Sequence, residues 1–387
     1  MKIVHSIGVK FARDGIGYIA YQRTAEVYRR GFLKRVMAPS FAPSEIGERY
    51  CLRLPLSERL TGALSRFLPL SRQYLVRDRV FDWSVARNLP DADIFHGWTS
   101  QALFSMRGAR ARGQMTFLER PNSHPFAFSE IMKEEYRINS VRLCPVDPIL
   151  LDTQIRECDE ADFVIVPSVF AYESFLKEGF DPARLLLVPF GVDAKRFRPA
   201  PRSAADTVFR VVFVGQIGLR KGVHYLLEAW SRLKLKDAEL VLAGWLHPDI
   251  VNTLKRYKAL PDVTIGAFTL DTAAVYQTAS VCVFPSIEDG FGLVVLEAMA
   301  CGVPVIVTEN TGAKDAVTHD EDGFIVPIRD VEALKEKISY FYTKREECRR
   351  MGDIAVSKAR AHTWDICAEK LIEAYRNAVP KTKDGDV

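Results

Sequence analysis

Short apolar runs alternate with amphipathic stretches along the first half of the chain. The runs that predict strands are residues 2–7, 93–96, 116–119, 163–167 and 185–189. Between them, residues 18–30 and 149–161 carry apolar side chains three and four positions apart, the spacing of a helix that buries one face. Strands that alternate with helices are typical of parallel α/β sheets, so the first half is predicted to be a doubly wound domain.

The same alternation restarts after residue 207 with sharper periodicity. Segment FRVVFVG (209–215) predicts a buried strand, and residues 224–233 predict a helix with one apolar side. Further strands are predicted at residues 239–244, 263–268, 281–286, 303–308 and 323–327, and further helices at residues 330–343, 346–360 and 364–378. Asp271 and Asp330 are predicted N-caps, because short acidic side chains accept hydrogen bonds from the first turn of a helix.

The stretch between the two halves is rich in proline, alanine and charge, and it predicts a linker. The expected organisation is an N-terminal domain over 1–190, a linker over 191–207, a C-terminal domain over 208–362, a C-terminal helix over 363–379 that packs back on the N-terminal domain, and a disordered tail over 380–387. Both domains are expected to be Rossmann-like. Doubly wound sheets bind ligands at the carboxyl ends of their strands, so two such domains that face each other predict a cleft between them.

Composition restricts the class of protein. Of 387 residues, 48% are apolar and 26% charged, which excludes a disordered chain. No apolar run reaches the roughly 18 to 20 residues that cross a bilayer, and the N-terminus has no cleavage site of a signal peptide. The seven cysteines are odd in number and lack metal-ligand spacing. They are predicted to be reduced thiols in a cytoplasmic protein.

Positive charge is concentrated near the N-terminus. Residues 1–115 carry 19 Lys and Arg against 9 Asp and Glu, although the whole chain has a net charge of only +4. Segment 52–80 alternates leucine clusters with six arginines. Two interpretations stay open: a solvated helix pair that packs its leucines inward, or a peripheral contact with an anionic membrane. No nucleic-acid partner is predicted, since no binding motif accompanies the charge.

The segment VFPSIEDGFGLVVLEAMACGVPVI (283–306) contains the most informative chemistry. A buried strand is followed by a glycine turn and a helix that begins near Leu293, and the free N–H groups of a helix start attract phosphate. Asp289 stands in the turn, and Glu297 lies in an otherwise apolar helix where a lone carboxylate needs a partner. Carboxylates accept hydrogen bonds from sugar hydroxyls. The segment therefore predicts a sugar-nucleotide site, formed by Asp289, Gly290, Phe291, Gly292, Leu293, Val294 and Glu297. The alternative is structural, with Asp289 as an N-terminal helix charge and Glu297 on the surface.

This segment resembles the signature of the group 1, or family 4, retaining glycosyltransferases with the GT-B fold. In that family two carboxylates separated by seven residues precede and enter this helix. Asp289 and Glu297 have that spacing, and Glu288 is a second candidate for the first position. The family usually has Glu where Asp289 stands. The resemblance implies that the first carboxylate and the nearby backbone hold the donor sugar, and that the second carboxylate holds the nucleotide ribose.

A second resemblance to the same family lies at 212–230, which matches its first C-domain strand, phosphate loop and helix. Lys221 matches the lysine that neutralises the donor diphosphate. Gln216 occupies the position of the usual arginine and cannot carry charge, and Arg220 is a nearby candidate to compensate. Without this context, a Lys and an Arg at a helix start are equally consistent with surface charge.

The N-terminal half offers weaker candidates. Gly15 and Gly17 resemble the family's glycine-rich turn at the cleft, where close approach of a phosphate or an acceptor needs glycine, although an ordinary turn has the same pattern. His96 follows a strand in the region where many members carry a cleft histidine, often two residues later, at the position of Trp98. His124 lies on a second candidate cleft loop, 119–125. Each histidine has a structural role as its alternative.

An Asp-x-Asp pair, Asp91 and Asp93, invites a metal site. Glycosyltransferases that bind a metal carry such a pair after a strand, whereas this pair precedes one, so a loop cap is predicted and no metal.

The predicted protein is a GT-B enzyme that transfers a sugar from a nucleoside diphosphate sugar to an acceptor, without an essential metal or other cofactor. The resemblance implies retention of configuration and polysaccharide biosynthesis as the field of action. The N-terminal domain would bind the acceptor, which is a glycan, a lipid-linked sugar or a small molecule. The protein is expected in the cytoplasm, including the cytoplasmic membrane face.

Rival hypotheses are a silent sugar-nucleotide-binding subunit, favoured by Gln216 and Trp98, and an epimerase or phosphorylase of the same fold. A nicotinamide dehydrogenase is disfavoured because no G-x-G-x-x-G joins the first strand to its helix. UDP, GDP and ADP all remain open as the nucleotide.

Overall fold

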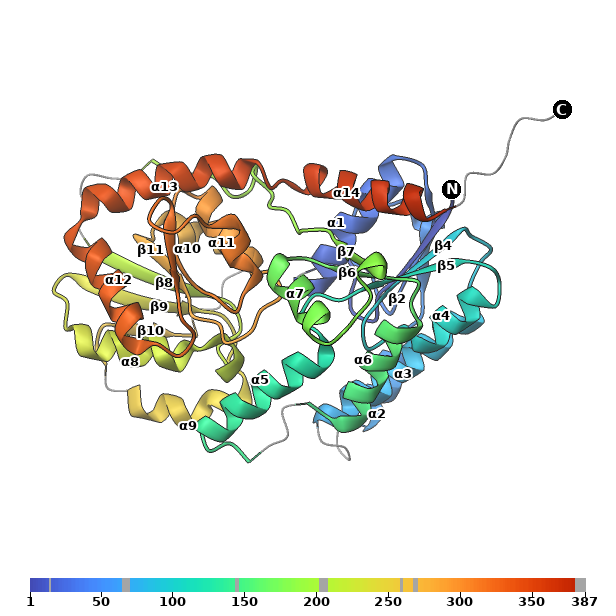
Figure 1. Cartoon of the computed structure of the whole chain (residues 1–387), viewed down its shortest axis with the longest axis horizontal. Helices are drawn as coiled ribbons and strands as arrows, with labels where there is room; N and C mark the ends of the chain where they lie inside the picture. Colours follow the sequence, from blue (N-terminus) through green and yellow to red (C-terminus); the bar gives the residue numbers. More distant parts are fainter. Residues whose placement is uncertain are drawn as a thin grey trace.

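The computed structural model describes residues 1–13, 15–64, 70–142, 146–201, 208–257, 260–266 and 271–379. Two parallel sheets, each flanked by helices, lie side by side, with the N-terminal sheet on the right and the C-terminal sheet on the left (Figure 1). The predicted architecture of two doubly wound α/β domains is confirmed. All strand pairs in both sheets are parallel.

The N-terminal sheet has seven strands in the order β3-β2-β1-β4-β5-β6-β7. Their bounds are β1 Ile3–Ser6, β2 Leu33–Ala38, β3 Cys51–Arg53, β4 Ile94–Trp98, β5 Met115–Glu119, β6 Phe163–Val166 and β7 Leu185–Leu187. Two of them were not predicted. β2 has two cations near its start, and β3 has only three residues, at the start of a segment whose later part is helical. The strand order reverses between β1 and β4, which is where doubly wound sheets open a crevice.

The helices that the structure describes in the N-terminal half lie between these strands in the sequence. They are α1 Gly15–Arg29, α2 Leu56–Leu64, α3 Leu70–Arg87, α4 Leu103–Arg110, α5 Pro125–Ile138, α6 Pro148–Glu160 and α7 Val169–Lys177. The predicted helix pair in segment 52–80 corresponds to α2 and the first part of α3, and residues 65–69 between them lie outside the described part of the chain. None of the described helices combines the length and apolar character that a bilayer crossing needs.

The C-terminal sheet has six strands in the order β10-β9-β8-β11-β12-β13. They are β8 Phe209–Val214, β9 Ala238–Ala243, β10 Val263–Ile265, β11 Val281–Phe284, β12 Val305–Thr308 and β13 Gly323–Val326. Its helices are α8 Val223–Leu233, α9 Val251–Leu254, α10 Thr272–Gln277, α11 Leu293–Ala300, α12 Val331–Thr343 and α13 Arg345–Arg360. Both predicted N-caps are confirmed: the Asp271 carboxylate accepts from the N–H of Ala274, and that of Asp330 from the N–H of Ala333.

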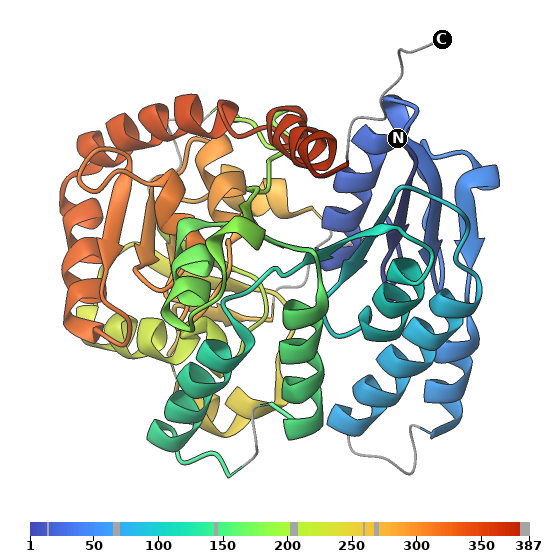
Figure 2. The same ribbon diagram turned by 45° about the vertical axis from the view of Figure 1, so that its right-hand side comes forward.

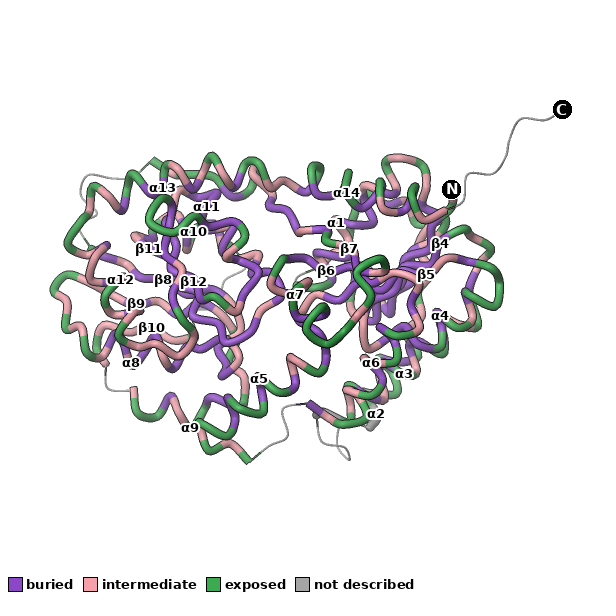
Figure 3. Tube along the Cα trace, viewed as in Figure 1, coloured by how far each residue is buried: buried purple, intermediate pink, exposed green. Residues whose placement is uncertain are grey.

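The central strands of both sheets are almost entirely buried, as expected for parallel sheets that are covered by helices on both faces (Figure 3). In β8, for example, Val211, Val212 and Phe213 have no exposed surface. Six cysteines in the described part of the chain are free thiols, and Cys144 lies outside it.

The chain returns to its first domain at the end. α14 (Trp364–Ala378) leaves the C-terminal domain after α13 and packs against α1 (Figure 2). Val192, which leads into the C-terminal domain, forms a parallel bridge with Thr363, where α14 is about to begin. The two crossings between the domains therefore lie side by side. Residues 202–207 of the predicted linker and the predicted tail 380–387 lie outside the described residues.

Candidate functional site

The loop that follows β8 carries two cations, Arg220 and Lys221. After Gly215 the chain makes a 3-10 turn, Leu219–Lys221, and α8 begins behind Gly222. Gly222 has a φ of 62°, and a Cβ atom there would lie 1.9 Å from the carbonyl oxygen of Pro285. The glycine therefore lets the loop after β8 pack directly on the end of β11. This contact brings Lys221 next to the turn that follows β11.

Lys221 and Asp289 form an ion pair at this place. The Lys221 ammonium donates to Oδ2 of Asp289, while Oδ1 accepts from the N–H of Phe291 at 3.1 Å. Arg220 lies 3.6 Å from the same Oδ2 and donates to the carbonyl oxygen of Glu288 at 3.0 Å. Burial raises the pKa of Asp289, but the two cations outweigh it, so the pKa lies below its ordinary value. The structure thus brings together Asp289, Lys221 and Arg220. Gln216 is half-buried in the same loop.

The predicted turn leads into α11 as expected. Gly292 is the N-cap with a φ of 81°, a conformation that favours glycine, and the helix begins at Leu293. The first-turn N–H groups, including those of Leu293 and Val294, have no acceptor within the helix and suit an anion.

Glu297 lies on the next turn of α11 and has the partner that its apolar setting requires. Its Oε2 accepts from the hydroxyl of Tyr276 in α10 at 3.1 Å. Burial raises the pKa of Glu297 to about 7, although the Tyr276 hydrogen bond opposes the shift. Tyr276 was not identified in the sequence, because it precedes the motif and carries no signal of its own.

Glu288 joins the two domains. It is fully buried, and its Oε1 accepts from the N–H and from the hydroxyl of Ser123, each at 3.0 Å. Asn122 donates to its Oε2 at 3.1 Å, and Arg220 lies 3.4 Å from the same oxygen. Both residues 122 and 123 belong to the loop after β5. The oxygens of Glu288 are therefore engaged by the loop after β5 and by Arg220.

Gly290 permits the close approach of this loop. A Cβ atom at 290 would lie 1.9 Å from the carbonyl oxygen of Pro121 and 2.7 Å from the Cα of Asn122. Both are backbone atoms of the opposite domain, so no side-chain movement can relieve the overlap.

Replacing Gly290 by Ala is therefore expected to separate the loop from Glu288. Loss of the charge-assisted bond should raise hydrogen exchange of the Ser123 amide by roughly 10- to 100-fold, measured by mass spectrometry. Gly47→Ala is the matched control, because Gly47 has a φ of −59° and its nearest neighbour would lie at 3.7 Å. Unchanged protection of Ser123 in the Gly290→Ala variant would contradict this account.

A second set of polar contacts joins α5 to the C-terminal domain. Glu135 has no exposed surface, and it pairs with His224 at 2.9 Å and with Arg329 at 2.8 Å. The next residue, Tyr136, donates to Asp249 at 2.9 Å. Helix α5 belongs to the first domain by sequence, yet its buried residues Glu135 and Tyr136 bind side chains of the second.

The prediction that His96 lies in the cleft is wrong. His96 has no exposed surface. Its Nδ1 is 2.5 Å from the hydroxyl of Tyr375, and its Nε2 is 3.2 Å from Glu119. It stacks on His5 with ring centroids 4.6 Å apart. The residue therefore fixes α14 on the sheet, a contact across 279 positions that no local pattern indicates.

His124 lies on the loop after β5, as predicted, but caps a helix there. Its Nδ1 accepts from the N–H of Phe126 at the start of α5, and its ring packs edge-on against Phe175. Burial, with the charge of Arg120 in second place, lowers the pKa of His124 to about 4. The ring is neutral near pH 7 and is poorly suited to hold a proton for catalysis.

The two N-terminal glycines begin α1 rather than precede it. Gly15 has a φ of 50°, and a Cβ atom at Gly17 would lie 2.2 Å from the carbonyl oxygen of Lys10. The loop after β1 therefore folds back on the first turn of α1. One residue further, the pKa of Tyr18 is raised by burial and also by Glu297, among other carboxylates, so α1 begins within electrostatic range of the C-terminal site.

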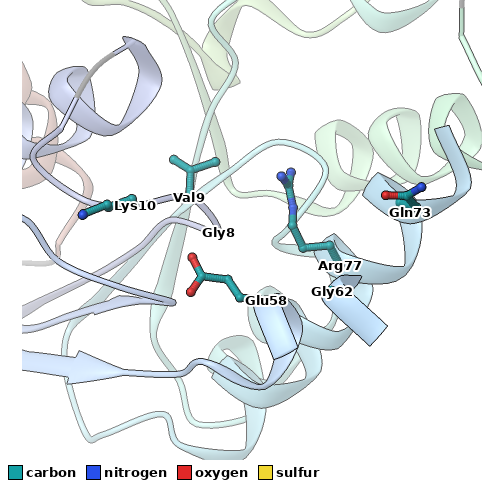
Figure 4. Close-up of a pocket in the computed structure, with 7 residues that line it drawn as sticks. All are labelled: Gly8, Val9, Lys10, Glu58, Gly62, Gln73 and Arg77. Carbon is teal, nitrogen blue, oxygen red and sulfur yellow. The ribbon is translucent and has the colours of Figure 1, made fainter. Parts of the chain in front are cut away.

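A pocket of about 350 Å³ lies beside this loop. Gly8, Val9 and Lys10 form one wall, and Glu58 and Arg77 extend toward them from α2 and α3 (Figure 4). The sequence did not mark this pocket, because its walls come from three separate segments that carry no shared motif.

Asp93 of the Asp-x-Asp pair lies just before β4, a central strand of the N-terminal sheet. Its carboxylate accepts from the N–H of Lys2 at 2.5 Å and so caps the start of β1. No cluster of three potential metal ligands occurs among the residues that the structure describes.

The C-terminal domain resembles known proteins in sequence. Residues 195–358 match the family described as "Glycosyl transferases group 1". A D-inositol 3-phosphate glycosyltransferase of Kribbella flavida is 31% identical over 230 residues, which is 54% of this chain and 54% of that protein. The chain therefore matches about half the length of this relative.

Two solved structures share the fold over nearly the whole chain. Sucrose-phosphate synthase from Thermosynechococcus elongatus aligns with a TM-score of 0.71 and 22% identity, over 97% of this chain and 99% of that one. Anabaena HepE in complex with UDP and glucose aligns with a TM-score of 0.69 and 15% identity, over 97% and 99%. The fold is GT-B, as the resemblance implied.

Proposed function

We propose that this chain, whose residues 195–358 belong to the group 1 glycosyl transferases, moves a sugar from a nucleoside diphosphate sugar to an acceptor hydroxyl. The transfer is proposed to retain configuration and to need no metal. The observation that carries the proposal is the ion pair between Lys221 and Asp289. It sets a cation for a diphosphate beside a carboxylate for sugar hydroxyls, at the start of α11. The solved HepE complex, which holds UDP and glucose in the same fold, supports it.

Donor binding would rearrange this ion pair. The diphosphate takes the place of Asp289 at Lys221, and the freed carboxylate accepts hydrogen bonds from the sugar. Lys221, Arg220 and the N–H groups at 293 and 294 stabilise the charge that develops as the bond from the sugar C1 to the diphosphate oxygen breaks. The acceptor oxygen bonds to C1 on the same face, and its proton passes to the departing diphosphate. No side-chain nucleophile is needed.

Glu297 is proposed to hold the ribose, which makes donor affinity depend on pH. With a pKa of about 7, this carboxyl is mostly neutral at pH 6 and mostly ionised at pH 8. The ionised form accepts hydrogen bonds from ribose hydroxyls more strongly, so affinity for UDP-glucose should rise by up to about tenfold over this range. Isothermal titration calorimetry at pH 6, 7 and 8 measures this affinity. The Glu297→Gln variant should bind UDP-glucose weakly at every pH. If its affinity rose with pH as steeply as that of the wild type, Glu297 would be excluded as the source of the pH dependence.

The function is tested by ligand screening followed by product analysis. UDP-, GDP- and ADP-sugars are compared for the rise in melting temperature that a ligand selective for the folded state produces. The stabilising donor is then incubated with and without candidate acceptors. A new glycoside with retained anomeric configuration, formed in the presence of EDTA, is the expected product. Epimerised donor without an acceptor, phosphorolysis, or binding without any turnover would each support a rival function instead.

The exposed side of the α2–α3 pair is proposed to contact anionic membranes. Leu56, Leu60, Tyr74 and Trp83 are each 38–44% exposed on these helices, among arginines that attract anionic headgroups. The protein should co-sediment with phosphatidylglycerol vesicles at low salt and lose this binding in an Arg59→Glu/Arg79→Glu variant. Equal sedimentation with neutral vesicles would contradict an electrostatic contact.

A further inference from the structure

The two carboxylate oxygens of Glu297 differ in their surroundings. Oε2 accepts from the hydroxyl of Tyr276 at 3.1 Å. Oε1 accepts no hydrogen bond from any residue that the structure describes, and the residue is only half-buried. One oxygen is therefore held from within the domain, and the other is available to a ligand.

Tyr276 lies in α10 and cannot itself contact a ligand, because it has no exposed surface. Its ring packs edge-on against Phe197, with 6.1 Å between the ring centroids. The side chain of the next residue, Gln277, donates to the carbonyl oxygen of Arg198 at 2.9 Å. These two contacts fasten α10 to the segment through which the chain enters the C-terminal domain. The Tyr276 hydroxyl is thus a donor in a fixed place.

Few charges act on Glu297 besides this bond. The other titratable and charged groups within electrostatic range are Tyr18 in α1, Arg196 of the linker, Cys282 in β11 and Cys301 after α11. Burial raises the pKa of both thiols and of both phenols, so all four are neutral near pH 7. The ionised carboxylate is favoured first by the Tyr276 hydrogen bond and second by Arg196.

The Tyr276 bond affects both the charge and the orientation of the carboxyl group. A hydrogen bond to an ionised carboxylate is stronger than one to the neutral acid, so the bond favours the ionised form against the effect of burial. It also holds the group in one orientation. A side chain that is already oriented loses less freedom when a ligand binds to it.

We infer that Tyr276 is a positioning residue for donor binding, whose hydroxyl holds Oε2 of Glu297 and so keeps the carboxylate ionised and Oε1 available for a ribose hydroxyl. Tyr276 acts through Glu297 and not by contact with the donor. The inference rests on the proposed function, in which Glu297 holds the ribose. It extends that function, because it assigns the pH range of donor binding to a residue outside the turn and helix that carry the two carboxylates.

The first measurement needs no ligand. In NMR spectra of the full chain with isotope-labelled glutamate, the carboxyl signal that is absent from the Glu297→Gln protein reports the ionisation of Glu297. In the wild type this signal should titrate near pH 7. Tyr276→Phe should raise the midpoint by about one pH unit, since a charge-assisted hydrogen bond to the ionised form is lost. An unchanged midpoint overturns the inference.

The second measurement is the affinity for UDP-glucose, by isothermal titration calorimetry. If the ionised carboxylate is the form that holds the ribose, a shift of about one pH unit makes Tyr276→Phe bind about fivefold more weakly at pH 7, but less than about twofold more weakly at pH 8.5. Loss of packing alone would weaken binding by the same factor at every pH. That outcome, or wild-type affinity at pH 7, overturns the inference.

A double-mutant cycle tests whether Tyr276 acts through Glu297. In the Glu297→Gln background, Tyr276→Phe should have no further effect on the affinity for UDP-glucose, and an undiminished effect there overturns the inference. Tyr257→Phe is the matched control, because Tyr257 donates the same kind of bond to Glu228, at 2.8 Å, outside the donor site. It should leave the pH profile of binding unchanged. Failure of UDP-, GDP- and ADP-glucose alike to bind would count against the proposed function, and the NMR titration would still test Tyr276.

Discussion

Replacing Lys221 by Met is expected to lower kcat for sugar transfer by about 100- to 1,000-fold, the usual cost of removing one preorganised group that stabilises a developing negative charge. Lys221 is only 9% exposed, so its charge acts in a poorly solvated place where little water screens it from a bound diphosphate. Burial and the neighbouring Arg220 lower its pKa, and Asp289 opposes that shift. Steady-state rates at saturating donor measure the effect.

The matched control is Lys236→Met. This variant loses an exposed lysine of the same domain, and its kcat should equal that of the wild type. Asp289→Asn breaks the same ion pair from the other side but leaves the cation in place. It should therefore slow transfer through poorer positioning of the sugar, while donor diphosphate affinity is kept. Melting curves of all three proteins establish that each is folded at the assay temperature. Wild-type kcat in the Lys221→Met protein would sink the proposed function.

The largest expected effect on stability comes from Glu119, in the interior of the N-terminal domain. Glu119 has no exposed surface, and Arg23 is 1% exposed, with 3.3 Å between them. Glu119→Gln leaves the Arg23 charge buried without a counter-charge, which should cost about 3–5 kcal/mol of unfolding free energy. Urea unfolding measures the loss. Glu130→Gln, at an exposed helix position, should change stability by no more than about 0.5 kcal/mol.

The pH dependence of this loss follows from the direction of the shift. Burial by itself would raise the pKa of Glu119. Arg23 and His96 lower the pKa by more than burial raises it, so the folded-state pKa lies below the ordinary 4.5. The ionised group therefore stabilises the fold fully above pH 4.5, and this contribution is lost as the pH falls through the lower folded-state value. The difference in unfolding free energy between wild type and Glu119→Gln should therefore become smaller as the pH falls through the folded-state pKa. An Arg23→Met/Glu119→Leu variant should recover much of the stability, and a loss below about 1 kcal/mol in Glu119→Gln would contradict the account.

The parts of the site that the sequence predicted are those carried by contiguous segments. The turn and helix from Asp289 to Glu297 form a single strand–turn–helix unit, so spacing alone placed both carboxylates. Lys221 was identified because residues 212–230 resemble the corresponding strand, loop and helix of the family. The pairing between Lys221 and Asp289 depends on packing of the loop after β8 against β11 at Gly222 and Pro285, which no single segment encodes.

The errors and omissions arise where tertiary contacts decide the role of a residue. His96 was expected at the end of a strand, as a cleft histidine would be, but it lies within β4 and contacts Tyr375 of α14. Glu288 stands next to Asp289 and looked interchangeable with it, yet the loop after β5 takes up its oxygens. The strands β2 and β3 were missed because one carries adjacent charges and the other is only three residues long. For His96 and Glu288, the sequence pattern was local, but the residues that determine their contacts lie far away in the sequence.

The position of α14 has a consequence for how the protein is made. Tyr375 reaches the buried histidines His5 and His96, with His5 Nε2 at 3.3 Å, so the N-terminal domain lacks part of its interior until α14 has been synthesised. The N-terminal domain therefore cannot reach its final packing before α14 has left the ribosome. A ribosome that stops before residue 364 would release a chain whose N-terminal domain stays incomplete. Such products should be the ones that chaperones and proteases recognise.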